Sequence, residues 1–174
     1  MMKRTRCIAT LTIGLLATAA LAESPYVGQV NAPIKALTAE EQAALLDGQG
    51  AGFARAAALN GYPGPKHVLE LSEQLGLSES QRHATQALFA RMRAGARAAG
   101  AALVEAERAL DALYASKTAT RESVDAQLGR IEALRARLRG LHLDAHLEQA
   151  ALLTRHQIAM YAEARGYGAV NHRH

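Results

Sequence analysis

The chain has 174 residues, of which 49% are hydrophobic, only 4% are aromatic and none is tryptophan, a composition that favours closely packed helices over a β-sandwich. Of its 20 basic residues, three lie within the first six, which leaves 17 basic against 16 acidic side chains in residues 23–174 and a net charge of +1. This balance argues against nucleic-acid binding, and the single cysteine excludes an intramolecular disulfide or a thiolate zinc site.

Residues 1–22 have the pattern of a signal peptide. Three basic residues precede an apolar run over 8–21, and Ala20 and Ala22 provide the small-x-small pattern of a cleavage site. The run is too short to span a bilayer comfortably, and no later segment is apolar enough to do so. We therefore expect an exported protein that does not insert into the membrane after cleavage and that loses its only thiol, Cys7, with the leader.

Residues 23–36 are rich in turn formers and are predicted to run as an extended arm, ahead of a single helical domain over residues 37–166. The domain begins with a helix in which Thr38 is the N-cap and Glu41 the reciprocal partner three residues on. DGQGAG interrupts or ends this helix, which could resume for two turns over FARAAALN. NGYPGP is then a firm break, because its two prolines and two glycines cannot stay helical.

A short helix is predicted from about residue 66 to residue 74, closed by Gly76. LSESQ follows, in which Ser78 can cap the backbone while Gln81 reaches back to it. The long helix that starts here is predicted to run to about Ser116, and its apolar residues recur at spacings of three and four, which indicates a continuous packing seam. The seam consists of Leu88, Met92, Ala96, Ala99, Leu103, Ala106, Leu110 and Leu113.

Residues 116–120, SKTAT, form the predicted turn, and Thr120 restarts the helix with a second seam of similar length. So short a connection predicts that the two long helices fold back on each other as an antiparallel hairpin. LTRHQ, with Thr154 and Gln157, is another capping box that starts a last short helix, and residues 167–174 form a flexible tail. The predicted fold is all-α: a long antiparallel helical hairpin with shorter flanking helices.

The two copies of L-[ST]-x-x-Q, LSESQ and LTRHQ, around a long hairpin in an exported helical chain resemble the Spy/CpxP family of periplasmic proteins. The resemblance covers roughly residues 66–166. It implies a curved helical cradle that forms a homodimer and holds unfolded or regulatory proteins without ATP. A related branch, the periplasmic heavy-metal sensors, binds nickel, cobalt, copper or zinc through His, Glu and Met, so the resemblance leaves two functions open.

His142 and His146 lie one helical turn apart on the second long helix, and a helical wheel places the first inside the apolar stripe and the second at its edge. In a hairpin that turns near residue 118, positions whose numbers add up to about 236 face each other, so Met92 is the nearest residue of the opposite seam. His67, from the short helix, is a further candidate ligand. Two imidazoles beside a thioether suit copper or nickel, whereas the alternative is a pair of partly buried core histidines with Met92 as filler.

No catalytic pattern is present in the sequence, so we expect a protein that is not an enzyme and that requires no cofactor other than, at most, a divalent transition metal: copper, nickel, cobalt or zinc. No serine has a nucleophile-elbow context, and Leu143 stands where the HExxH motif of a metalloprotease needs glutamate. His172 and His174, in the tail, could bind metal adventitiously.

Arginines line both long helices among glutamates, which for any single residue indicates a solvated helix face. Collectively they could form a basic cradle that contacts unfolded, often acidic proteins. The expected function is thus an ATP-independent periplasmic chaperone or envelope-stress protein, with a metal-binding sensor or buffer centred on His142 and His146 as the alternative. The arginines expected to bind clients are Arg91, Arg93, Arg97, Arg135 and Arg139.

Overall fold

The computed structural model describes residues 24–167, so the predicted signal peptide and the tail after Tyr167 lie outside the described range. The described residues contain helices and turns but no strand. The chain divides into two compact units, residues 1–30 and residues 31–174. The described part of the first unit is a turn followed by the short 3-10 helix η1, Val27–Gln29.

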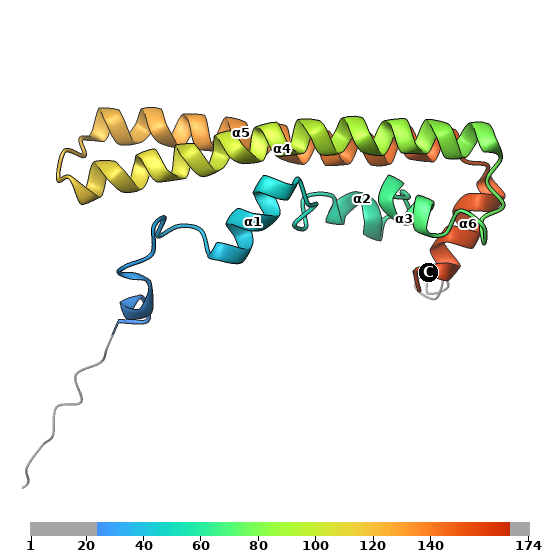
Figure 1. Ribbon diagram of the computed structural model, residues 1–174, viewed down its shortest axis with the longest axis horizontal. Helices are drawn as coiled ribbons and strands as arrows, with labels where there is room; N and C mark the ends of the chain where they lie inside the picture. Colours follow the sequence, from blue (N-terminus) through green and yellow to red (C-terminus); the bar gives the residue numbers. More distant parts are fainter. Residues whose placement is uncertain (1–23, 168–174) are drawn as a thin grey trace, which may run out of the picture. The chain divides into compact units, whose positions relative to one another are not determined.

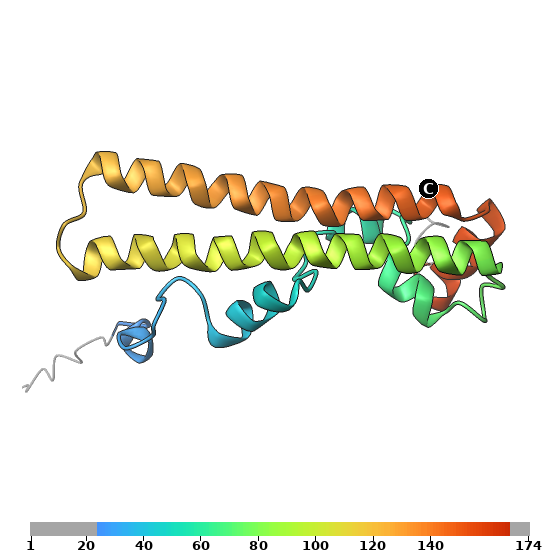
Figure 2. The ribbon, with the colours of Figure 1, turned by 45° about the horizontal axis from the view of Figure 1, so that its top comes forward.

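Two long helices dominate the second unit, α4 (Glu79–Ala115) and α5 (Arg121–Leu152). They lie side by side and run in opposite directions (Figures 1 and 2), and most of the contacts between elements are made by this pair. The turn between them contains Lys117 in a left-handed conformation, φ +59°. The predicted antiparallel hairpin and the position of its turn are therefore confirmed.

The hairpin has the predicted register in the half that carries the histidines. Leu141 packs where a Cβ on Gly95 would lie, and Gln149 donates a hydrogen bond to the hydroxyl of Thr85 at 3.2 Å. In both of these contacts the two residue numbers add up to about 236, which is the register predicted from the turn. The seam itself is apolar and rich in small residues, as its buried members Leu88, Ala96, Ala99, Leu103, Ala106, Ile131, Leu138 and Ala145 show.

Four shorter helices flank the hairpin. They are α1 (Ala39–Asp47), α2 (Arg55–Leu59), α3 (Pro65–Glu70) and α6 (Arg155–Ala164). α1 packs on α4, α2 on α5, and α3 on both long helices, so the segment before the hairpin follows it along one side (Figure 1). α3 ends earlier than residue 74, the predicted end, because the chain turns from Leu71 onwards until Gly76, at φ +58°.

The predicted capping boxes are present at three helix starts. Thr38 and Glu41 cap α1, and the two L-[ST]-x-x-Q copies cap α4 and α6. The two glutamines of these copies also bond to each other, since Gln81 Nε2 donates to Gln157 Oε1 at 2.9 Å and Gln157 Nε2 donates to Gln81 Oε1 at 3.1 Å. Each repeat is therefore a helix cap and one half of a bridge between the two helix starts.

The segment 23–36 was predicted as an extended arm, and the structure corrects this. Its described residues form turns and η1 rather than extended backbone. Ile34 is fully buried in the main hydrophobic cluster, and Lys35 forms an ion pair with Asp111 of α4 at 3.0 Å. The single apolar side chain at position 34 lacks the periodicity that would have identified it as core.

None of the helices within residues 24–167 combines the length and the apolar character required to cross a membrane.

Candidate metal site beside the hairpin

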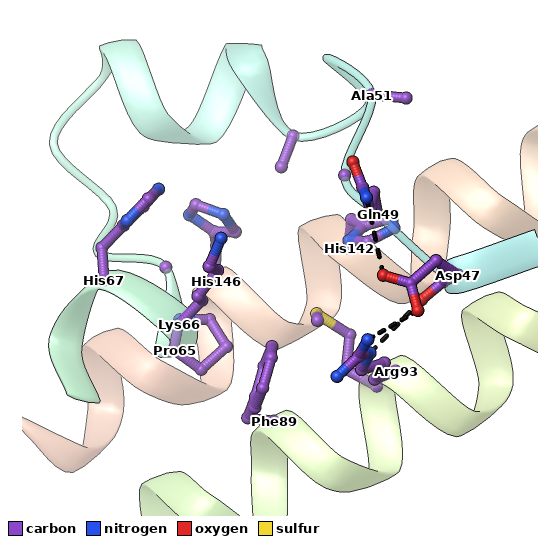
Figure 3. Close-up of a pocket in the computed structure, with 15 residues that line it drawn as sticks. Asp47, Gln49, Ala51, Pro65, Lys66, His67, Phe89, Arg93, His142 and His146 are labelled. Carbon is purple, nitrogen blue, oxygen red and sulfur yellow. Dashed lines mark hydrogen bonds and ion pairs between the residues drawn. The ribbon is translucent and has the colours of Figure 1, made fainter. Parts of the chain in front are cut away.

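A cavity of about 440 Å³ lies between the hairpin and the segments that flank it. All four residues predicted as metal ligands, His67, Met92, His142 and His146, line it. They come from three different helices, α3, α4 and α5. In the view of Figure 3, His67 and His146 lie on one side of the cavity, and His142 lies on the other side with Asp47 and Arg93.

His142 is the most deeply buried of the three imidazoles. Only 4% of its surface is exposed, and its Nε2 has no hydrogen-bond partner among the described residues. The ring of Phe53 stacks against it, with centroids 6.0 Å apart and an angle of 9° between the planes. A buried polar atom without a partner carries a desolvation cost, and a bound ligand would relieve it.

His146 is half-buried and held in one orientation by the loop between α2 and α3. Its Nδ1 donates a hydrogen bond to the carbonyl oxygen of Tyr62 at 2.8 Å, which leaves the lone pair on Nε2. The ring lies so close to Gly64 that a Cβ there would come within 2.9 Å of Cε1. Gly64 in turn donates its N–H to the hydroxyl of the buried Tyr161 at 3.3 Å, so α6 helps to fix the loop.

His67 is oriented by a carboxylate on its own helix. Its Nδ1 lies 2.7 Å from Glu70 Oε2, and this bond is the main cause of a lowered Glu70 pKa. The carboxylate accepts a hydrogen bond from Nδ1–H, so Nε2 is not used by this contact. An imidazole whose Nδ1–H is bonded to a carbonyl or a carboxylate is the usual arrangement behind a metal-ligating histidine.

The three imidazoles lie close enough to influence one another electrostatically. Burial lowers the pKa of His142, and the nearby His146 lowers it further. Burial also lowers the pKa of His146. The hydrogen bond to the carbonyl of Tyr62 raises this pKa, and the nearby His67 lowers it. Both rings are therefore shifted toward the neutral form, which is the form that binds metals.

Asp47, the one carboxylate among the described residues that line the cavity, is already paired. Its Oδ1 accepts hydrogen bonds from Arg93 and from Arg97, both at 2.6 Å, and these two bonds lower its pKa to about 2. Both guanidinium groups also donate to the backbone carbonyl of Asp47, at the end of α1. Asp47 thus fastens α1 to α4 instead of offering a free oxygen to the cavity.

Within residues 24–167 no three His, Asp or Glu side chains stand close enough together to hold a metal ion. The structure therefore places the four predicted ligands around one cavity, but it does not form a closed site from His, Asp and Glu alone. The thioether of Met92 is a further donor beside the imidazoles. Asp144, which stands between the two histidines in the sequence, is exposed and does not line the cavity.

The arginines expected to bind clients are mostly engaged within the chain. Arg91 pairs with Glu148 at 2.5 Å, and Arg135 pairs with the buried Glu107 at 2.6 Å. With Arg93 and Arg97 both on Asp47, four of the five have an acidic partner. Arg139 has no ion pair with any described residue and lines a shallow hollow beside α2.

Sequence reasoning missed Asp47 and Gly64, which line the cavity, and Phe53 and Tyr62, which contact His142 and His146. The only signal in the sequence for these residues was the density of glycine and proline at 47–52 and 60–65, which predicted breaks in the helices but not the contacts that the loops make.

No known protein family, curated protein or solved structure matches the chain.

Proposed function

We propose that the protein binds a transition-metal ion in the cavity between α3, α4 and α5. The observation that carries this proposal is the buried Nε2 of His142, which has no partner in the described chain and lines the same cavity as His146, His67 and Met92. Nitrogen and sulfur donors of this kind suit copper, nickel, cobalt or zinc. A role as a periplasmic metal buffer or sensor agrees with the predicted signal peptide and with the resemblance to the heavy-metal-sensor branch.

Calorimetric titration of the untagged protein with copper, nickel, cobalt and zinc tests the proposal. We expect binding of at least one ion at micromolar concentration and its loss in the His142→Ala, His146→Ala double variant. The matched control is His83→Ala with His156→Ala, because both of these histidines are exposed on helices and neither lines the cavity. The His172→Ala, His174→Ala variant removes the tail histidines and so distinguishes adventitious binding by the tail from binding in the cavity. The proposal fails if the cavity variant binds like the control.

A second candidate function is the ATP-independent holding of non-native or regulatory proteins by a homodimer of this chain. It is favoured by the exposure of large apolar side chains on the hairpin, with Tyr114 and Leu147 each 56% exposed. The single unpaired arginine of the expected set, Arg139, adds a cationic group on α5. The intramolecular pairing of the other four arginines is the reason why we place this function second.

The aggregation of an unfolded client in the presence of excess protein tests the second function. If the hairpin holds clients through its exposed apolar residues, Leu147→Ser should weaken protection, while Arg139→Ala should weaken it for acidic clients only. Arg130→Ala, another exposed residue of α5, is the control. Aggregation at the same rate with and without the protein would remove this candidate.

A further inference from the structure

The donors that line the cavity carry no negative charge. They are imidazole nitrogens and the sulfur of Met92. No free carboxylate is among the lining residues, since Asp47 is held by two guanidinium groups. Zinc, nickel and cobalt would therefore enter without any negative ligand to compensate their charge.

The fixed charges around the cavity have the same sign as the ion. Lys66 and Arg93 line it. Lys66 pairs with Glu70 at 3.9 Å and Asp47 is shared between Arg93 and Arg97, so three cations face two carboxylates and the net fixed charge of this group is positive. Coulomb repulsion is proportional to the charge of the ion, so a singly charged ion meets half the repulsion that a doubly charged ion meets.

The number of ligands points in the same direction. No three His, Asp or Glu side chains within residues 24–167 are placed to hold a metal together, so a full tetrahedral shell of nitrogen and oxygen, as zinc prefers, is not in place. Soft ions that accept few ligands are bound by thioether and imidazole. Met92, half-buried beside Phe89 and Pro65 in the cavity wall, supplies the soft donor in an apolar setting.

We infer that the cavity selects a monovalent soft ion, Cu(I), over divalent metals, with Met92 as the residue that sets this selectivity. The inference rests on the proposed metal-binding function and specifies its ligand. His142 and His146 provide the imidazole nitrogens, and the positive charge of Arg93 and Lys66 disfavours doubly charged competitors.

Competition titrations in oxygen-free buffer measure this selectivity. Cu(I), kept reduced by ascorbate, is titrated into the protein against a chromophoric Cu(I) chelator, and zinc, nickel and cobalt are titrated against a chelator for divalent ions. Ag(I) serves as a redox-inert ion of the same charge. We expect Cu(I) and Ag(I) to bind more tightly than every divalent ion.

The decisive variant is Met92→Leu, which removes the sulfur and keeps a side chain of similar size. We expect it to weaken Cu(I) and Ag(I) by about tenfold or more and to leave any residual divalent binding nearly unchanged. Met160→Leu is the matched control, since Met160 packs against the other hydrophobic cluster and does not line the cavity. Melting temperatures without metal show that both variants are folded.

The outcomes separate the inference from the function on which it rests. If a divalent ion binds more tightly than Cu(I) and the His142→Ala, His146→Ala variant abolishes that binding, the metal site stands and the preference for Cu(I) is overturned. Equal Cu(I) affinities of the Met92→Leu and Met160→Leu variants also overturn it. If no ion binds at all, the proposed function itself fails.

Discussion

The two hydrophobic clusters of the helical unit are closed in different ways. Around α1 the chain relies on close backbone contact, because Gly100 of α4 has no Cβ and the carbonyl of Leu45 occupies that space. Around α3 and α6 it relies on side-chain hydrogen bonds, because Gln81 and Gln157 bridge the two helix starts over a second apolar cluster that contains Tyr161. One region depends on the absence of a side chain, and the other on the presence of two amides.

The cavity lies where these two regions meet. Its wall takes residues 47–51 from the end of the first region and residues 64–67 from the start of the second. Neither apolar cluster extends into the gap, and the polar groups of His142 and His146 face it instead. The comparison indicates that a site can form where two differently stabilised parts of a fold leave space between them, so each part can be weakened separately to see what the site requires.

The largest effect is expected from Gly100→Val in the first region. A branched side chain would overlap the backbone of α1 and force it away from α4, which should lower the free energy of unfolding by about 3 kcal/mol. Urea denaturation measures the lost free energy of unfolding. The rate of amide hydrogen exchange should increase most in residues 39–47, which form α1.

The control for this variant is Gly129→Ala on α5. Gly129 is exposed, and a Cβ there would meet nothing within 4 Å. Alanine is the better helix former, so this change should stabilise the protein by about 0.5–1 kcal/mol. If Gly100→Val is as stable as the wild type, then α1 is not held by its close approach to α4.

Gln157→Ala weakens the second region and should have a smaller effect. The variant loses the reciprocal cap of α6, the bridge to Gln81 and a hydrogen bond to the carbonyl of Leu75 at 3.3 Å. Because the lost partners are partly buried, we expect a cost of about 1–2 kcal/mol in urea denaturation. Gln86→Ala, at an exposed position of α4, should change little. Equal costs for the two variants would mean that the glutamine bridge contributes no stability.

The helices were predictable from the sequence because their signals are local. Each capping box is contained in four residues, and the alternation of spacings three and four along the seam needs only one helix. That Met92 lies opposite the histidine pair could be predicted from the position of the turn alone. In an antiparallel hairpin, the turn determines which residues of the two helices face each other. The residues of the site that lie on the hairpin could thus be identified in advance.

The remaining features depend on long-range contacts. The sequence reveals that Arg93 and Arg97 are charged, but it does not reveal that Asp47, 46 residues before Arg93, lies between them. The carbonyl of Tyr62 and the missing Cβ of Gly64 are backbone features of a loop whose path no periodicity describes. Long side chains and irregular loops find partners that only the folded chain defines.

Asp47→Asn tests the ion pairs that fasten α1 to α4 and should have a smaller effect than the two preceding variants. The pKa of Asp47 is lowered from 3.8 to about 2 by Arg97 and Arg93, so the native state favours the ionised carboxylate. The stabilisation it provides is fully present above the unfolded-state pKa of 3.8 and is lost as the pH falls from there toward 2. Wild type and variant should therefore differ in denaturation midpoint at neutral pH and converge near pH 2.

The difference should remain modest even at neutral pH, because the partners are partly exposed and surface ion pairs are screened by water and salt. Glu148→Gln breaks the more exposed pair with Arg91 and should cost still less. A more specific consequence concerns the cavity, where the guanidinium of Arg93 would lose its negative partner. The net positive charge at the cavity then increases, so Asp47→Asn should weaken the binding of divalent ions more than that of Ag(I). Equal weakening of both would show that the charge of this cluster does not act on the site.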